Sequence, residues 1–179
     1  MSNLAFEIRY TVDDYKQWEG DWELIGGRAI AMAPSPFGPH QAIVSRIVSD
    51  LDRSLEACSK SCFVYTELDY IVDEETVLRP DVLVSCQKIK DFAKKAPEFI
   101  VEVLSPSSAI KDKNIKFPIY EREGVLFYMM VDYNLQKVKL YKLIDGKYRK
   151  IAEEIDGKMS VDFDGCELEF DIDRWWQVL

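Results

Sequence analysis

Two strongly apolar stretches rich in β-branched residues, 79–84 and 99–104, each contain one acidic residue, Asp81 and Glu102. Such stretches are typical of buried strands. Because a charged group taken out of water without compensation costs several kcal/mol, a buried acid needs a hydrogen bond, a counter-ion or a bound cation. Two such acids on neighbouring strands therefore predict a site for a divalent metal ion.

The alternation of side chains along a strand indicates how these two acids could meet. It places Asp81 and Leu83 on one face of the first strand, and Ile100 and Glu102 on one face of the second. The chain between them is long enough for a crossover and short enough for the two strands to be neighbours. Mg²⁺ binds one or two carboxylates and keeps several waters, so a neighbouring pair would suit this ion.

Length and charge limit the classes of protein that the chain can represent. With 179 residues, of which 47% are hydrophobic, the chain can bury one core, and we expect a single domain over residues 1–179. The net charge of -9 argues against a surface that coats nucleic acid, because phosphate binding draws on clustered Lys and Arg. To act on nucleic acid, an acidic chain needs a local basic rim, a metal ion or a dimer cleft.

Features that report on the cellular compartment favour the cytoplasm. The sequence has no apolar run of the ~20 residues that span a bilayer, and residues 1–7 lack the basic and apolar pattern of a signal peptide. Its four cysteines are too few and too scattered for a disulfide scaffold, and they form no C-x-x-C motif. We therefore expect a cytoplasmic protein, without a membrane partner, whose cysteines are reduced thiols.

The remaining pattern predicts an α+β domain with a mixed sheet. Thr11 is a possible N-cap for a short helix, and Gly26-Gly27 predicts a hairpin turn. Trp175 and Trp176 are expected to seal the core or a dimer seam. The expected helices are 12–18, 40–51 and 110–123, the expected strands include 22–25, 28–32, 62–72, 125–131, 137–143 and 148–151, and a charged, loosely helical connection is expected over 88–95.

The predicted helix after Glu102 adds further polar side chains to the candidate site. Asp112, Lys116 and Tyr120 follow one another at steps of four, which places them on one helix face. A lysine directed at a metal-bound water could hold or deprotonate the nucleophile and stabilise charge on a phosphate. Pro118 is unexpected here, because proline inside a helix costs about 3 kcal/mol or kinks the helix.

Several motifs follow one another in a fixed order between residues 15 and 143. They are Glu23-Leu24-Ile25-Gly26-Gly27, a Pro-rich loop ending in His40-Gln41, Arg79-Pro80-Asp81-Val82, Glu102-Val103-Leu104-Ser105-Pro106-Ser107-Ser108, and Lys116-Phe117-Pro118-Ile119-Tyr120-Glu121-Arg122-Glu123-Gly124-Val125. Together they resemble the Uma-two family of putative restriction endonucleases, within the PD-(D/E)XK nuclease superfamily. Because several motifs match in order, this resemblance is far more specific than a lone Pro-Asp pair.

The resemblance implies a restriction-endonuclease-like core of α/β/α type, with metal ligands on two central strands. Asp81 would be the acid of the Pro-Asp motif and Glu102 the acid of the second motif, and together they would bind Mg²⁺ or Mn²⁺. The resemblance also makes Glu23 a candidate site residue. It further implies an endonuclease that hydrolyses phosphodiester bonds of DNA and, by analogy with related nucleases, a homodimer.

The third element of the superfamily pattern differs in this sequence. Two positions after Glu102, where the superfamily usually has lysine, stands Leu104. The basic role would therefore pass to the following helix, where Lys116 is preferred over Lys113. This departure also favours an alternative, a catalytically inactive nuclease-fold domain that serves as an interaction module for nucleic acid or protein.

Each candidate residue also has a purely structural explanation. Asp81 could pair with Arg79, and Glu102 with a lysine. Glu23 could be a strand-end acid beside Arg28. The structural explanations of the remaining candidates are a solvated helix face for Lys113 and Lys116, a helix-start residue on the surface for His40, and core packing or a hydrogen bond to the site for Tyr120.

Overall fold

A computed structural model describes residues 8–32, 38–105 and 109–179 of the chain. The predicted Pro-rich loop lies largely outside these residues, as do Pro106, Ser107 and Ser108 of the motif that begins with Glu102. No helix in the described part of the chain is long and apolar enough to span a membrane.

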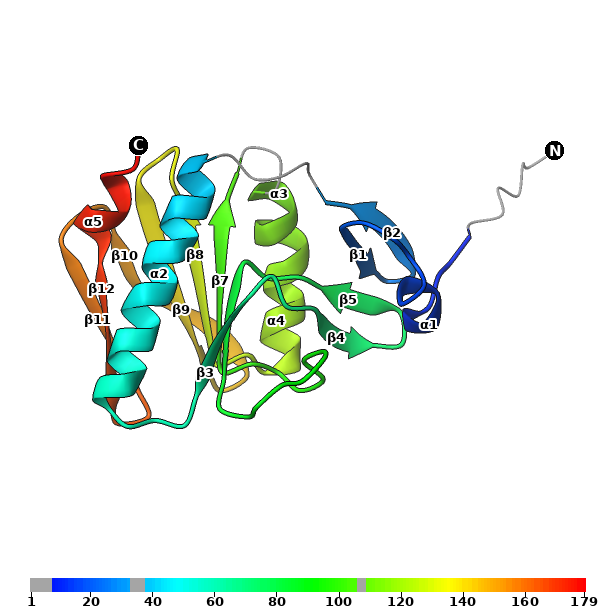
Figure 1. Cartoon of the computed structure of the whole chain (residues 1–179), viewed down its shortest axis with the longest axis horizontal. Helices are drawn as coiled ribbons and strands as arrows, with labels where there is room; N and C mark the ends of the chain where they lie inside the picture. The colour runs from blue at the N-terminus through cyan, green and yellow to red at the C-terminus, as the bar shows by residue number, and fades with distance from the viewer. Residues whose placement is uncertain (1–7, 33–37, 106–108) are drawn as a thin grey trace.

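The centre of the fold is a mixed sheet, as predicted. Within the described residues it has six strands in the order β10-β9-β8-β7-β6-β3. β7 and β8 pair in parallel, and the other neighbours pair antiparallel (Figure 1). The strands are β3 (Phe63–Thr66), β6 (Val82–Ser85), β7 (Phe99–Leu104), β8 (Phe127–Asp132), β9 (Lys137–Ile144) and β10 (Lys147–Glu154).

One face of this sheet is covered by α2 (Gly38–Ala57) and the C-terminal segment (Figure 1). Ile43, Ile47 and Leu51 repeat with helical period on α2 and are fully buried against the sheet. A two-stranded hairpin and a short helix complete this layer: β11 (Lys158–Phe163), β12 (Cys166–Asp171) and α5 (Ile172–Trp176). Trp175 is fully buried in the same core, which confirms the predicted sealing role.

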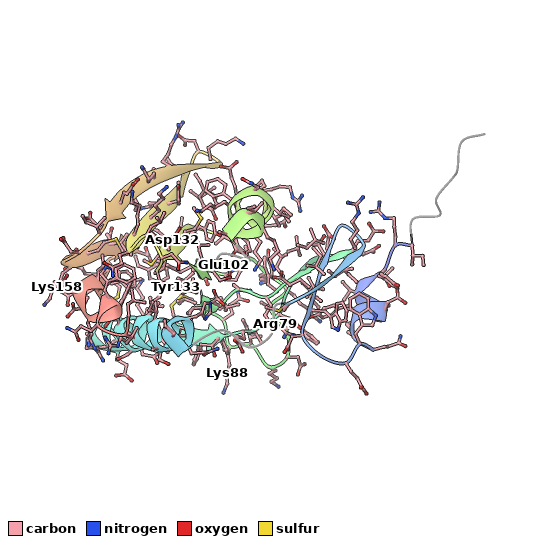
Figure 2. The ribbon with its side chains drawn as sticks, turned by 90° about the horizontal axis from the view of Figure 1, so that it is seen from above. Arg79, Lys88, Glu102, Asp132, Tyr133 and Lys158 are labelled. Carbon is pink, nitrogen blue, oxygen red and sulfur yellow. A yellow bond between two sulfur atoms is a disulfide. The ribbon has the colours of Figure 1, made fainter. Side chains whose placement is uncertain are left out.

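The opposite face carries the helical segment that follows β7, so that the sheet lies between α2 and α4 (Figure 2). The predicted helix 110–123 is present but irregular: α3 (Ala109–Lys111), a π-helical turn η1 (Asp112–Lys116) and α4 (Phe117–Glu123). Pro118 stands in the first turn of α4, directly after the wider π turn. The helical run is continuous here, and the Phe117 amide still donates to the Asp112 carbonyl oxygen in the π pattern. Pro118 has no N–H to continue the ladder, so the change from π to α hydrogen bonding coincides with the proline.

A second, smaller sheet lies beside the central one, in the order β2-β1-β5-β4. Its hairpin is the predicted one about Gly26-Gly27, and Thr11 caps α1 (Val12–Tyr15) as predicted. The strands are β1 (Trp22–Ile25), β2 (Arg28–Ala31), β4 (Tyr70–Asp73) and β5 (Thr76–Leu78).

Two predicted segments differ from the structure. The single strand expected over 62–72 is wrong, because the chain turns at Glu67 (φ 50°) and divides between β3 in the central sheet and β4 in the small sheet. The connection over 88–95 is not helical. Ala93 forms a parallel β-bridge with Tyr70 of β4, and backbone hydrogen bonds join the two segments there.

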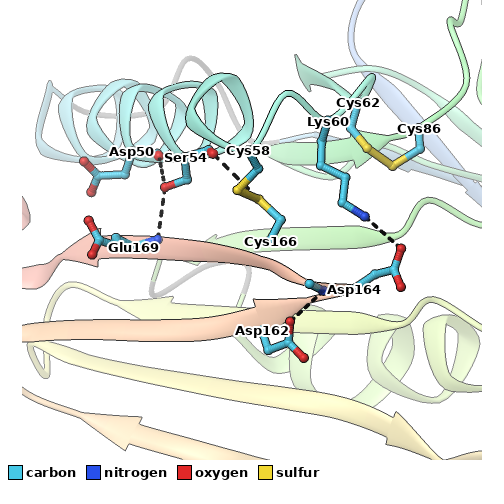
Figure 3. Close-up of a disulfide and its surroundings, with 11 residues drawn as sticks. Asp50, Ser54, Cys58, Lys60, Cys62, Cys86, Asp162, Asp164, Cys166 and Glu169 are labelled. Atoms are coloured by element: carbon cyan, nitrogen blue, oxygen red, sulfur yellow. Dashed lines mark hydrogen bonds and ion pairs between the residues drawn. A yellow bond between two sulfur atoms is a disulfide. The ribbon is translucent and has the colours of Figure 1, made fainter.

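The prediction of reduced thiols is also wrong in this structure, which contains two disulfides (Figure 3). Cys58 at the end of α2 is bonded to Cys166 at the start of β12, 108 residues away. Cys62 is bonded to Cys86. Cys62 directly precedes Phe63 in β3 and Cys86 directly follows Ser85 in β6, and Phe63 and Ser85 lie opposite each other. The strand register and the packing of α2 bring these thiols together, and their spacing in the sequence gives no sign of it.

Candidate functional site

The two predicted metal ligands lie at one end of the β6–β7 pair. These strands are antiparallel neighbours, with Val82 opposite Val101. Asp81 and Glu102 come next in this register, so they lie opposite each other, and the negative charge of Asp81 helps to raise the pKa of Glu102. The predicted adjacency of the two strands is therefore confirmed.

Asp81 contacts both the neighbouring strand and α2. The backbone amide of Val103 donates a hydrogen bond to its Oδ2 at 2.7 Å, and His40 Nε2 lies 3.4 Å from the same oxygen. His40 is only 6% exposed, so its expected surface position is wrong; the first turn of α2 directs it toward Asp81. Burial lowers the pKa of His40, but the hydrogen bond and charge of Asp81 outweigh it, and the pKa is raised.

Glu102 is buried in the middle of the site. Its Oε1 accepts hydrogen bonds from Lys116 Nζ and from the Tyr120 hydroxyl, both at 2.8 Å. Burial raises the pKa of Glu102 well above its usual value, and the nearby carboxylates raise it further against the opposing charge of Lys116. Burial and the charge of Glu102 likewise raise the pKa of Tyr120. Tyr120 therefore remains a hydrogen-bond donor to Glu102.

Lys116 is 2% exposed and contacts oxygen atoms from four residues. Its Nζ lies 2.8 Å from Glu102 Oε1, 2.8 Å from Glu23 Oε1, 3.5 Å from Asp112 Oδ1 and 3.4 Å from the Arg79 carbonyl oxygen. Burial lowers the pKa of Lys116, but the three carboxylates outweigh it, and the pKa is raised well above its usual value. The ammonium group therefore stays charged.

Glu23 joins the small sheet to the helical segment. It is fully buried in β1, and its carboxylate pairs with Lys111 and Lys116 and accepts a hydrogen bond from the Arg79 amide at 3.0 Å. Burial raises the pKa of Glu23, but the charges of the two lysines outweigh it, and the pKa is lowered. In the following text, the lysine cluster means Glu23, Glu102, Lys111, Asp112 and Lys116.

The predicted helix face is found, and a π turn brings its three side chains closer into line than a regular α-helix would. Asp112, Lys116 and Tyr120 are all buried toward Glu102. In an α-helix each step of four residues overshoots a full turn by about 40°. The π turn is wider, so it reduces this drift and keeps the three side chains in line. Lys113 lies apart from them, with Nζ 3.6 Å from Asp132 Oδ2 at the end of β8.

Sequence reasoning missed two contributions to the cluster. Lys111 has the appearance of a solvated charge, and its partner Glu23 lies 88 residues away, so no local signal reveals the pair. The second is the backbone of Arg79. Its guanidinium pairs with Asp69 and Asp21, and its amide and carbonyl reach the cluster. The guanidinium is thus engaged away from Asp81, contrary to the structural alternative for that residue.

A hard divalent cation needs oxygen ligands, which the carboxylates of this site supply. Within the described ranges, no group of three or more His, Cys, Asp or Glu side chains is arranged to hold a metal. Mg²⁺, however, commonly takes one or two carboxylates and retains waters. Asp81 and Glu102 lie opposite each other, and burial, followed by the charges of Asp112, Asp81 and Glu23, raises the pKa of Glu102 against the opposing charge of Lys116. The pair therefore suits a hard cation.

Comparisons with known proteins identify the fold and the family of the chain. A crystal structure described as a putative nuclease belonging to DUF820, from Anabaena variabilis, has a TM-score of 0.75 and 19% identity, over 94% of this chain and 98% of that chain. This likeness confirms the predicted restriction-endonuclease-like α+β fold. No curated protein matches the chain. The profile of the Uma2 (Uma-two) family, described as "Putative restriction endonuclease", matches residues 12–170. The chain therefore belongs to the Uma2 family.

Proposed function

We propose that this protein is a metal-dependent endonuclease that hydrolyses phosphodiester bonds of DNA. The observation that carries the proposal is the buried Glu102, opposite Asp81 and hydrogen-bonded to Lys116 and Tyr120. Burial of a carboxylate among other carboxylates is unfavourable for stability, and perturbed groups of this kind are concentrated at functional sites. Membership of the Uma2 family supports the same activity.

In this proposal Asp81 and Glu102 hold Mg²⁺ or Mn²⁺. When bound, such an ion supplies an activated water and neutralises charge on the phosphate. The Val103 amide fixes one oxygen of Asp81, and Tyr120 fixes one oxygen of Glu102. His40 Nε2 lies 3.4 Å from the same Asp81 oxygen and adds a second contact to it. These contacts would hold both carboxylates in one geometry before substrate arrives.

Lys116 is the proposed basic residue of the site. Its contacts orient Glu102 and Glu23 together, and its positive charge lies beside the group that would face the phosphate. We propose that it positions the attacking water and stabilises the charge that develops during hydrolysis. Glu23 holds Lys116 in place, and Lys113, which pairs with Asp132, has no part in this proposal.

Cleavage of plasmid and single-stranded DNA with Mg²⁺ or Mn²⁺ tests the activity. We expect Asp81→Asn and Glu102→Gln to abolish cleavage, because each removes a charged ligand at nearly constant shape. Glu167→Gln is the matched control, since Glu167 is exposed on β12. Equal cleavage by all four proteins would refute the proposal.

A second candidate function is a nuclease-fold module that binds nucleic acid or protein without cutting. Two observations favour it: Leu104 stands at the position where the superfamily usually has lysine, and the described residues contain no group of three metal-ligating side chains. Titration calorimetry with Mn²⁺ distinguishes the two functions. An inactive module would bind no ion, or would bind one without hydrolysing DNA.

The assembly and the location of the protein are further proposals. A homodimer would supply the two active centres that a double-strand cut needs, and light scattering of the purified protein tests it. A cytoplasmic location would keep the four cysteines reduced, although the structure pairs them. Thiol quantification immediately after cell lysis distinguishes the reduced from the oxidised form.

A further inference from the structure

A cavity of about 190 Å³ lies beside the lysine cluster, where α1, the small sheet and the connection after β6 meet. Its walls combine aromatic rings with three charged side chains, Lys16, Asp69 and Arg79. The residues that matter here are Tyr15, Trp18, Trp22, Asp69, Arg79 and Phe92.

The aromatic rings of this cavity are only partly used by the core. Trp18 packs edge-on against Tyr15 and Trp22, with ring centroids 5.5 and 5.8 Å apart, and is itself half-buried. Phe92 is half-buried and, within the described part of the chain, belongs to none of the three hydrophobic clusters. A large ring that packs into no core is available for stacking on a ligand.

The charged groups of the cavity are each paired with an opposite charge, and Lys16 Nζ lies 3.0 Å from Asp13 Oδ1. Arg79 Nε lies 2.7 Å from Asp69 Oδ1, and Arg79 Nη1 lies 2.7 Å from Asp21 Oδ1. The Tyr15 hydroxyl donates to Asp69 Oδ2 at 2.8 Å. The guanidinium disfavours a cationic ligand and the carboxylates disfavour an anionic one. A neutral, flat ligand with hydrogen-bonding edges suits both the rings and this pair, and nucleobases have these properties.

Arg79 connects the cavity to the candidate site. Its amide donates to Glu23 and its carbonyl oxygen lies 3.4 Å from Lys116 Nζ, while Asp81 follows two positions later. Figure 2 shows Arg79 between the small sheet and the strand that carries Glu102. A strand with one phosphate at Asp81 and Glu102 could therefore place a neighbouring base in the cavity.

The connection that carries Phe92 supplies positive charge to the same region. This connection lines a second cavity of about 280 Å³, and Phe92 lines both the first cavity and this one. Its lining includes Lys88, Lys90, Lys94 and Lys95. In a chain with a net charge of -9, this is a local basic rim of the kind that contact with phosphates requires.

We propose that the cavity of Trp18, Trp22 and Phe92 binds one unpaired nucleobase of the nucleic acid, and that the lysines beside Phe92 contact the adjoining phosphates. The choice of nucleic acid as the ligand rests on the proposed function, whereas the cavity is independent of hydrolysis. The base would stack on Phe92 and form hydrogen bonds with the Asp69–Arg79 pair.

Fluorescence of 2-aminopurine, an adenine analogue that is quenched by stacking, tests this proposal. Single-stranded oligonucleotides with the analogue at successive positions are titrated with the Asp81→Asn protein in Mg²⁺, so that binding is measured without cutting. We expect one position to change its emission on binding. Adding Phe92→Ala should remove that change and weaken binding about tenfold, whereas Phe63→Ala, an exposed phenylalanine on β3, should alter neither.

The outcomes separate this proposal from the nuclease proposal. No response at any position, or an equal response with Phe92→Ala, overturns the base-binding cavity whether or not the wild-type protein cuts DNA. A response that Phe92→Ala removes supports the cavity even if the wild-type protein cuts nothing. In that case the nuclease proposal fails alone.

Discussion

Asp50 and Glu102 are both buried carboxylates, but they have different partners. Asp50 Oδ2 accepts hydrogen bonds from the Asp171 amide and from Trp175 Nε1, and Asp50 Oδ1 lies 2.8 Å from Arg53 Nη2. Glu102 shares Lys116 with two other carboxylates. Hydrogen-bond donors therefore surround Asp50, whereas the three carboxylates of the lysine cluster outnumber its two ammonium groups. The first arrangement is typical of a structural contact between two segments, and the second is typical of a site that can bind a cation.

Asp50 belongs to a row of residues along one side of α2 that connect this helix to the C-terminal segment. Asp50, Ser54 and Cys58 are spaced at steps of four and all contact the C-terminal segment: Asp50 as above, Ser54 Oγ through the Glu169 amide at 3.0 Å, and Cys58 through the disulfide to Cys166. We call these residues the C-terminal joint (Figure 3). Because it lies on the far side of the sheet from α4, stability and activity should respond separately to changes in the two regions.

The largest expected effect is on stability, through the disulfide of the C-terminal joint. Replacing Cys58 and Cys166 together by serine should lower the free energy of unfolding by about 5 kcal/mol, because a long loop in the unfolded chain is no longer closed. Replacing Cys62 and Cys86 should cost about 3 kcal/mol, because that loop is shorter. Urea unfolding without reductant measures both. An unfolding midpoint of the wild-type protein that reductant leaves unchanged would contradict the prediction.

Asp50→Ala should be the next largest change. It leaves the Trp175 indole and the Asp171 amide without their acceptor and should cost about 3 to 4 kcal/mol. DNA cleavage per folded molecule should stay the same. Asp52→Ala is the control, since Asp52 is exposed on the same helix. If Asp50→Ala abolished cleavage in a fully folded protein, the distinction between joint and site would be wrong.

Glu102→Gln should give the opposite result to Asp50→Ala, with cleavage lost and stability retained. Glutamine keeps the acceptor for Tyr120 but removes the charge, so cleavage should fall at least about hundredfold. The raised pKa of Glu102 means that its ionised form opposes folding above pH 4.5, the usual value. The variant should therefore be no less stable than the wild-type protein at pH 8, as measured by urea unfolding. A marked loss of stability would instead indicate that Glu102 is structural.

The lowered pKa of Glu23 predicts a dependence on pH. A carboxyl whose pKa is lowered by folding stabilises the protein above its unfolded value of about 4.5, and this contribution disappears as the pH falls through its folded value. Glu23→Gln should therefore cost about 2 kcal/mol at pH 7. The difference from wild type should shrink progressively below pH 4.5. Unfolding free energies at a series of pH values measure it, and a constant difference would contradict the assigned ion pairs.

Tyr120→Phe should have the smallest effect. It removes one hydroxyl donor from Glu102 while Lys116 remains. We expect a loss of about 1 kcal/mol in stability and a cleavage rate reduced several-fold rather than abolished. Phe117→Leu tests packing alone, because Phe117 lies in the same aromatic group without a hydroxyl. An effect as large as that of Glu102→Gln would make Tyr120 a direct participant in the chemistry.

The sequence predicts those parts of the fold that depend on local pattern. Apolar runs revealed β6 and β7, and helical period revealed α2. The same strand alternation assigned Asp81 and Glu102 each to one face of its strand, whereas the register that sets them opposite each other, with Val82 facing Val101, comes from the structure. The division of 62–72 at Glu67 was not predictable, since each half is a good strand and only the sheet that it joins differs.

The parts of the site that the sequence missed or left open depend on contacts between distant segments. Lys111 was missed, because it looks like a surface charge until β1 places Glu23 against it. His40 was a candidate with a surface position as its alternative, and only the packing of α2 on the sheet places it beside Asp81. In both cases the tertiary fold, and no property of the neighbouring residues, converts a polar side chain into a partner of the site.

The π turn at Asp112–Lys116 has a consequence for insertions and deletions in this chain. A π turn contains about one residue more than an α-helical turn, because its hydrogen bonds span five residues instead of four. Loss of one residue there would therefore restore a regular α-helix and leave the later side chains in phase. Loss of Pro118 or Ile119 from α4 would instead rotate every later side chain by about 100° and turn Tyr120 away from Glu102, although every strand of the sheet would be intact. The candidate site can thus accommodate a one-residue deletion in its π turn but not in the helix that follows.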